Sequence, residues 1–150
     1  MRSRLLPVLI LVLIVGCQPS STETKTDTIE MDRRTRLRFN QYWVKGKELY
    51  AVHCSNCHLD NGEGLANLYP PLKSSDYLME NLPRAACIIV NGQAQAIVVN
   101  GITYNQMMPG VETLTPLETA ELLTFITNSW GNQAGLSGVK EVEKWLKACE

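Results

Sequence analysis

Apolar and polar residues divide the chain into three parts. An almost wholly apolar run of eleven residues covers Leu5–Val15. Residues 18–28 contain no large apolar side chain. From Leu37 onward, aromatic and aliphatic residues recur at helical spacing, which predicts a helix that ends at about His53. The residues that carry this periodicity are Phe39, Tyr42, Trp43, Leu49 and Tyr50.

Two further elements are predicted in the middle of the chain. Leu82–Val90 is expected to be helical, with Pro83 in the first turn and Asn91-Gly92 as the stop signal. Residues 96–104 alternate around Asn100-Gly101, which is typical of a two-residue, type I′ β-hairpin.

The last third of the chain predicts two more helices. Thr115-Pro116-Leu117-Glu118 is a capping box with proline at the first helical position, and it opens a helix that runs to about Ser129. After Gly131, apolar residues again follow helical spacing, and we expect a short extra helix packed on the core by Trp145. The fold class is therefore all-α, with one minor β-hairpin. The apolar residues of the extra helix are Val139, Val142, Trp145, Leu146 and Cys149.

The first residues have the features of an export signal. Arg2 and Arg4 precede the apolar run, which is too short to cross a bilayer core of about 30 Å as a helix. The run ends in Ile14-Val15-Gly16-Cys17, which resembles the lipobox of bacterial lipoproteins. That resemblance implies that Cys17 is lipidated and becomes the mature N-terminus. The alternative is an ordinary secretory signal peptide.

These features divide the chain into four predicted segments. Residues 1–16 are a lipoprotein signal peptide, 17–36 a lipidated N-terminus and flexible tether, 37–131 the folded domain, and 132–150 a C-terminal extension with a short helix. The basic run from Arg33 to Arg38 is interpreted as a solvated stretch, with a membrane-surface or acidic-partner contact as the alternative.

Composition limits the possible functions. A chain of 150 residues suits one modest domain plus a tail. The formal net charge is −1, and no sustained basic stripe indicates a nucleic-acid partner. Without Arg2 and Arg4, 12 basic residues stand against 15 acidic ones, so the mature chain is mildly acidic.

The central chemical motif is Cys54-Ser55-Asn56-Cys57-His58. Two cysteines separated by two residues and followed by histidine are the pattern of c-type haem attachment, in which both thiols bond covalently to the haem and the histidine binds the iron. A thioredoxin-like pair would need a strand–helix pattern that is missing here. A zinc site would normally need a second cysteine pair, and neither Cys87 nor Cys149 has a neighbouring cysteine or histidine.

The second axial ligand is expected to be a methionine. The other histidine, His53, abuts the motif and cannot reach the opposite haem face. Met79 lies near a predicted short helix and is assigned to the core. Met107 and Met108 are left, and Pro109 holds Met108 in an extended loop where its thioether can face the iron.

Taken together, the part from about Phe39 to Gly131 resembles class I cytochromes c, in particular small bacterial ones found as lipoproteins or as domains of respiratory complexes. The resemblance implies a cytochrome c fold around one covalent haem c, with Met108 as the distal ligand. It implies that the Pro70 carbonyl, or alternatively that of Pro71, accepts the ring N–H of His58. The motifs that carry it are Cys-Ser-Asn-Cys-His, Tyr69-Pro70-Pro71-Leu72, Ser75-Asp76-Tyr77-Leu78, Tyr104-Asn105-Gln106-Met107-Met108-Pro109 and Asn128-Ser129-Trp130-Gly131-Asn132.

The resemblance also implies a helix crossing and a function. Gly46 and Tyr50 on the first helix should pack against Leu122 and Phe125 on the last core helix. The function expected is single-electron transport in a respiratory chain rather than enzymatic catalysis, between a donor complex and a terminal oxidase or reductase. A haem–copper oxidase is the acceptor that the resemblance suggests. The haem domain would be anchored by its lipid to the cell membrane, in the periplasm or otherwise outside the cytoplasmic membrane.

Two alternatives stay open. The chain could be a permanent cytochrome subunit of a dehydrogenase or oxidase complex. It could also be a haem enzyme or gas sensor with a labile sixth ligand, although the Met-Met-Pro sequence argues against this. Separately, Cys87 and Cys149 are left over in a compartment that permits disulfides, so we expect them to pair; otherwise Cys87 is a buried core residue and Cys149 a free thiol.

Overall fold

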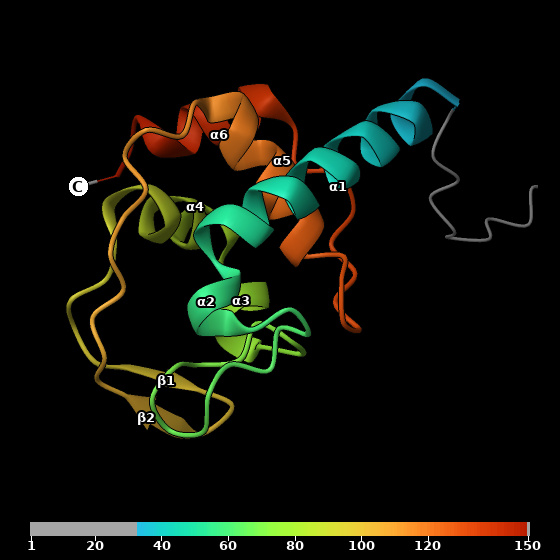
Figure 1. The fold of residues 1–150 in the computed structure, drawn as a ribbon. Helices are drawn as coiled ribbons and strands as arrows, with labels where there is room; N and C mark the ends of the chain where they lie inside the picture. The colour runs from blue at the N-terminus through green and yellow to red at the C-terminus, as the bar shows by residue number, and fades with distance from the viewer. Residues whose placement is uncertain (1–32, 150) are drawn as a thin grey trace, which may run out of the picture. The chain divides into compact units, whose positions relative to one another are not determined.

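The computed structural model describes residues 33–149, which form a helical domain with one small antiparallel hairpin (Figure 1). The predicted all-α architecture with a minor hairpin is confirmed. In chain order the elements are α1 (Arg33–His53), α2 (Ser55–His58), α3 (Asp76–Glu80), α4 (Leu82–Asn91), β1 (Ile97–Val99), β2 (Ile102–Tyr104), α5 (Pro116–Ile126) and α6 (Val139–Leu146).

The N-terminal boundary of the domain differs from the prediction. The signal peptide, Cys17 and most of the tether lie outside the described residues. Residues 33–36 were predicted to be part of the tether, but they form the first turn of α1. Arginine is a good helix former and no glycine or proline interrupts this stretch, so the helix continues upstream of Leu37. No helix in the described range is long and apolar enough to span a membrane.

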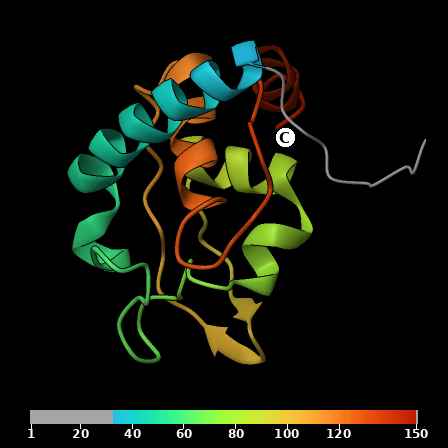
Figure 2. The same cartoon turned by 90° about the vertical axis from the view of Figure 1, so that its right-hand side faces the viewer.

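The core is built on the crossing of α1 over α5, which both views show (Figures 1 and 2). Gly46 lies directly against the backbone of Glu121, and a Cβ atom at that position would lie 2.7 Å from the Cβ of Phe125. The ring centroids of Tyr50 and Phe125 are 5.3 Å apart, and Leu122 is fully buried. The predicted pairing of these helices is therefore confirmed, and α5 becomes the central helix of the domain.

Helix α5 ends three residues earlier than predicted, at Ile126. Beyond it, the N–H of Asn128 bonds to the carbonyl of Phe125, three residues back, and the Asn128 amide donates to the carbonyls of Thr124 and Gly135. These side-chain bonds fold the following segment back on the helix, so the α-helical pattern stops.

The hairpin is attached to α3 by a pair of hydrogen bonds. Asn100 and Gly101 both have positive φ, at 50° and 79°, as the predicted type I′ turn requires. The N–H of Asn100 donates to the Asp76 carboxylate at 2.7 Å, and the N–H of Asp76 donates to the Asn100 side chain at 3.1 Å. The hairpin is therefore fixed relative to the helical core.

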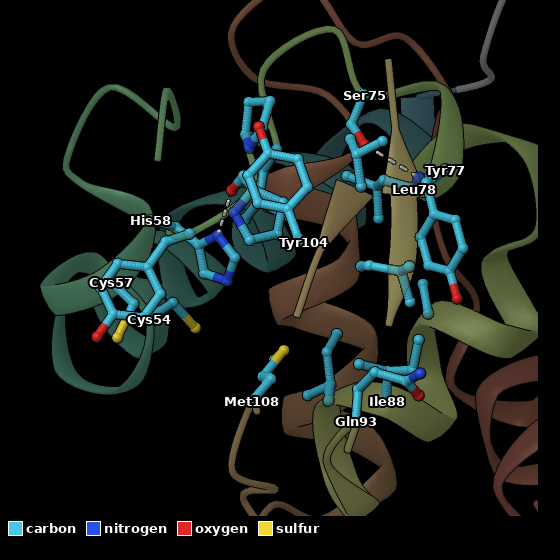
Figure 3. A pocket seen from close by; sticks show the side chains of 18 of the residues that line it. Cys54, Cys57, His58, Ser75, Tyr77, Leu78, Ile88, Gln93, Tyr104 and Met108 are labelled. Atoms are coloured by element: carbon cyan, nitrogen blue, oxygen red, sulfur yellow. Dashed lines mark hydrogen bonds between the residues drawn. The ribbon is translucent and has the colours of Figure 1, made fainter. Parts of the chain in front are cut away.

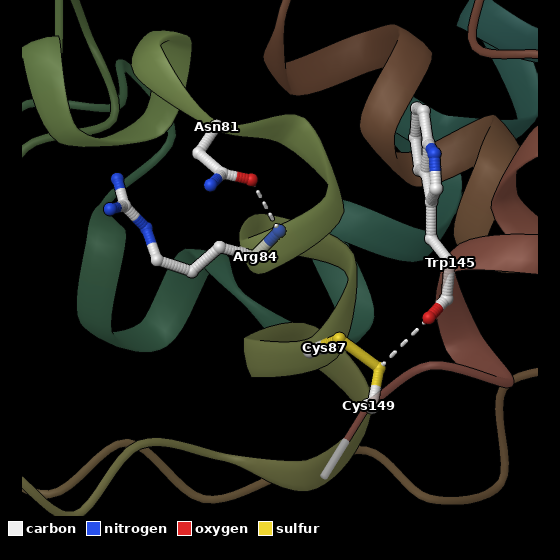
Figure 4. Close-up of a disulfide and its surroundings, with 5 residues drawn as sticks. All are labelled: Asn81, Arg84, Cys87, Trp145 and Cys149. Carbon is white, nitrogen blue, oxygen red and sulfur yellow. Dashed lines mark hydrogen bonds between the residues drawn. A yellow bond between two sulfur atoms is a disulfide. The ribbon is translucent and has the colours of Figure 1, made fainter.

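The predicted C-terminal helix is present as α6, and Trp145 packs against the core as expected. Trp145 is only partly buried there, and Val142 is the residue of α6 that is fully buried. The structure places a disulfide between Cys87 of α4 and Cys149, with Cα atoms 5.5 Å apart (Figure 4). This bond attaches the end of the chain to α4.

Candidate haem-binding site

The motif cysteines lie on one short turn at the end of α1. The N–H of Cys54 bonds to the carbonyl of Tyr50, and the N–H of His58 bonds to the carbonyl of Cys54, both at 2.9 Å. The Tyr50 hydroxyl donates to the carbonyl of Leu59 at 2.6 Å and so fixes the other end of the turn. The turn carries both sulfurs and the imidazole toward one cavity (Figure 3). Local helical hydrogen bonding is thus enough to bring Cys54, Cys57 and His58 together.

His58 is oriented by a backbone contact. Its Nδ1 lies 2.9 Å from the carbonyl oxygen of Pro70, which can only accept, so Nδ1 carries the proton and Nε2 has a free lone pair. The side chain is 7% exposed, and this burial lowers the pKa of His58, while the Pro70 contact opposes the shift. The imidazole is therefore neutral near pH 7 and ready to bind a metal ion.

Met108 is held by a two-bond pairing with Gln93. The N–H of Met108 donates to the carbonyl of Gln93, and the N–H of Gln93 donates to the carbonyl of Met108, each at 2.8 Å. The thioether of Met108 points into the cavity (Figure 3), whereas Met107 is 60% exposed. Both methionines line the cavity, but Met108 is the one whose backbone is fixed by the pairing with Gln93.

The cavity is lined mostly by apolar side chains, and its volume is about 110 Å³. Burial raises the pKa of the Cys54 thiol to about 12, and the neighbouring Cys57 adds to this effect. Residues from several elements contribute apolar surface, among them Leu72, Leu78, Ile89, Val99, Leu122 and Ile126. A flat, largely apolar group that bonds to two thiols and needs an imidazole and a thioether fits these residues.

Comparison with known proteins identifies the family. The sequence profile of the cytochrome c family matches residues 43–130, more than half of the chain. The chain belongs to the cytochrome c family. It is 32% identical over 99 residues to cytochrome c-552 of Thermus thermophilus, a match that covers 63% of this chain and 75% of the relative.

Other relatives are parts of larger proteins. The cytochrome c subunit of the quinone-type alcohol dehydrogenase of Gluconacetobacter polyoxogenes is 28% identical over 92 residues, and that of Gluconobacter oxydans is 27% identical over 101 residues. These matches cover 61% and 66% of this chain but only 20% and 21% of the relatives.

Membership of the family defines the cofactor and the general role. Cys54 and Cys57 stand at the spacing of covalent haem c attachment, and the cavity fits that group. The protein is therefore a class I cytochrome c and an electron carrier.

Several residues that shape the site carry no signal for that role in the sequence. Gln93 pairs with the methionine loop through its backbone, so its side chain gives no signal. Gly92 and Gly110 permit the close approach between this loop and the end of α4, and Asn91-Gly92 had been interpreted only as a helix stop. The guanidinium of Arg84 lies 3.7 Å from the ring centroid of Tyr77 and donates to the Tyr77 carbonyl, which holds this cavity residue in place.

Proposed function

We propose that this protein carries single electrons in a respiratory chain through a haem c whose axial ligands are His58 and Met108. The observation that carries the proposal is that the neutral imidazole and the thioether, from different parts of the chain, point into one cavity beside Cys54 and Cys57 (Figure 3). The proposed ligand set is the one found in cytochromes c with raised reduction potentials.

The protein residues would hold and tune the group as follows. Cys54 and Cys57 attach it covalently, and Pro70 keeps the His58 ring in one orientation. Gln93 keeps Met108 at the cavity, and the apolar lining excludes water. When bound, haem c supplies the Fe(III)/Fe(II) couple by which one electron is taken up and released.

The location and the partners form the second part of the proposal. The lipobox-like sequence before Cys17 supports a lipid anchor on the cell membrane, with the haem domain in the periplasm or otherwise outside the cytoplasmic membrane. There it would accept electrons from a respiratory donor complex and deliver them to a terminal oxidase, which we propose to be a haem–copper oxidase. Such electron-transfer contacts are small and transient.

A second candidate is a permanent cytochrome subunit of a dehydrogenase complex. The observation that favours it is the similarity to cytochrome c subunits of quinone-type alcohol dehydrogenases. Solubilising the membranes in mild detergent and purifying this protein through an affinity tag separates the two. If a dehydrogenase co-purifies in a stoichiometric amount, the protein is a permanent subunit and not a free carrier.

The ligand assignment is tested by replacing each of the two neighbouring methionines with alanine in turn. Met108→Ala should abolish the weak far-red absorption band that iron–sulfur ligation gives the oxidised protein, and should lower the reduction potential. Met107→Ala is the matched control and should leave both unchanged, because that side chain is 60% exposed. If Met107→Ala alone removes the band, the assigned sulfur is wrong.

The anchor is tested at Cys17. A Cys17→Ser variant should fail lipoprotein processing. With an ordinary secretory peptide in place of the leader, the same variant should be released as a soluble protein with an unchanged haem spectrum. Mass spectrometry of the wild-type N-terminus should show acyl chains on Cys17, and an unmodified residue there would refute the anchor.

A further inference from the structure

Helix α1 differs in charge from the rest of the domain. It contains one acidic residue, Glu48, against six basic ones. From Cys54 to the end of the chain the balance reverses, with ten acidic and five basic residues. Positive charge is therefore concentrated on one helix of a chain whose overall charge is slightly negative. The six basic residues of α1 are Arg33, Arg34, Arg36, Arg38, Lys45 and Lys47.

The outer face of α1 combines this charge with exposed apolar side chains. Tyr42, Gly46 and Tyr50 are buried on the side that packs against α5. On the opposite side, Leu37 and Val44 are 57% and 52% exposed. These two residues share one face of the helix because they are seven positions apart in the sequence. At 100° per residue, the basic side chains fall on both flanks of this apolar line. We call this surface, from Arg33 to Lys47, the basic face of α1.

Exposed apolar side chains between basic flanks are one feature of helices that lie in a membrane interface. In that arrangement the apolar side chains enter the headgroup region, while long basic side chains extend to the lipid phosphates. In the part of the chain that the structure describes, no acidic side chain forms a salt bridge with Arg33, Arg36 or Arg38. Their charges are therefore available to an external anion.

The basic face lies apart from the electron-transfer site. The residues that line the haem cavity begin at Cys54, and none belongs to α1. The haem-attachment turn follows the C-terminal end of α1, and α5, which packs against α1, contributes Leu122 and Ile126 to the cavity lining. A surface that binds through α1 would thus leave the mouth of the cavity accessible to a redox partner.

We propose that the basic face of α1 binds the surface of an anionic bilayer, with Arg33, Arg36 and Arg38 on lipid phosphates and Leu37 and Val44 in the headgroup region. The proposal rests on the proposed lipid anchor for its setting. Cys17 precedes Arg33 by 16 residues, and a chain of that length spans at most about 55 Å. The anchor would keep α1 close to the membrane, and the basic face would then orient the domain.

The test uses holoprotein released by the secretory peptide with Cys17→Ser, so that no acyl chain contributes. Binding is measured by co-sedimentation with vesicles of 30% phosphatidylglycerol in phosphatidylcholine, and with phosphatidylcholine vesicles alone. The key variant carries Arg33→Gln, Arg36→Gln and Arg38→Gln. The matched control carries Lys140→Gln, Lys144→Gln and Lys147→Gln, which remove the same charge from exposed positions of α6 and its C-cap.

The Cys17→Ser holoprotein with an unchanged basic face should bind the anionic vesicles, and raised salt should weaken this binding. Each arginine near an anionic surface contributes about 1 kcal/mol, which is roughly fivefold, so the triple arginine variant should bind about a hundredfold more weakly. The lysine control should change binding far less. Leu37→Ser should also weaken binding, by a factor that salt changes little.

Three results would overturn the proposal: no binding to anionic vesicles, an equal loss in the lysine control, or unchanged vesicle binding by the arginine variant. If the triple arginine variant bound vesicles normally but transferred electrons to a membrane complex more slowly, the basic face would be a docking site for an acidic protein. Because the protein tested lacks the lipid, none of these results depends on acylation of Cys17. Failure of the anchor itself would appear separately, in the mass of the wild-type N-terminus.

Discussion

Replacing Gly46 by alanine tests the helix crossing on which the haem site depends. In the middle of an exposed helix the change would be favourable, because alanine is preferred over glycine by about 1 kcal/mol. In this structure, however, the new methyl group would lie 2.6 Å from the carbonyl carbon of Glu121 and 2.7 Å from the Cβ of Phe125. Both neighbours are fixed parts of α5 and cannot rotate away.

The size of the effect follows from these distances. Ordinary contacts begin near 3.4 Å, and the carbonyl oxygen of Glu121 lies even closer to the new methyl group than the Cβ of Phe125, so α1 and α5 would have to separate by more than about 0.7 Å. A gap of that order removes roughly a quarter to a half of the dispersion energy at each affected contact. Overpacking of this kind costs about 1–3 kcal/mol, and the rigid neighbours place Gly46→Ala at the upper end. After the gain in helix propensity, we expect a net loss of about 2 kcal/mol.

The assay is guanidinium unfolding of the oxidised holoprotein, followed by circular dichroism in the far ultraviolet. Ala51→Gly, at an exposed position of the same helix, is the control and should cost about 1 kcal/mol through propensity alone. Because Leu122 and Ile126 of α5 line the cavity, Gly46→Ala should also weaken the iron–sulfur band before global unfolding. A Gly46→Ala protein more stable than wild type would refute the close crossing.

Three further outcomes are expected. Gly92→Ala should make the iron–sulfur band easier to displace with added imidazole, since φ is +83° at this position and the new Cβ would lie 2.7 Å from the carbonyl oxygen of Met108. Replacing both Cys87 and Cys149 by serine should lower the free energy of unfolding by about 4 kcal/mol, because the bond closes a loop across a sequence separation of 62; alkylation of both thiols in unreduced, denatured wild-type protein would show that no bond exists. Hydrogen bonds from the backbone N–H and the hydroxyl of Thr115 hold the pKa of Glu118 below its usual value of 4.5. The stability that these bonds contribute is therefore present above pH 4.5 and is lost as the pH falls below that value. Glu118→Gln should therefore flatten the acid limb of a plot of unfolding midpoint against pH.

Most local features of the fold could be predicted from the sequence. The Cys54–His58 turn, the capping box at Thr115, the type I′ turn at Asn100-Gly101 and the end of α4 all depend on contacts within about four residues. The residue types for such contacts stand next to one another along the chain, so their spacing is enough to predict them. Cys87 and Cys149 could be predicted to pair because the other cysteines of the chain were assigned to other roles.

Contacts between distant segments were decided only by the tertiary structure. Nothing near Gln93 indicates that its backbone pairs with Met108, since such pairing depends on how two loops meet and uses no side chain. Val142 rather than Trp145 became the fully buried residue of α6, because burial depends on which face of the helix meets α4 and α5. α5 ended at Ile126 because the segment after it folded back through Asn128. Each of these outcomes is a choice among several packings that the same local pattern would allow, and the packing of the whole chain selects one of them.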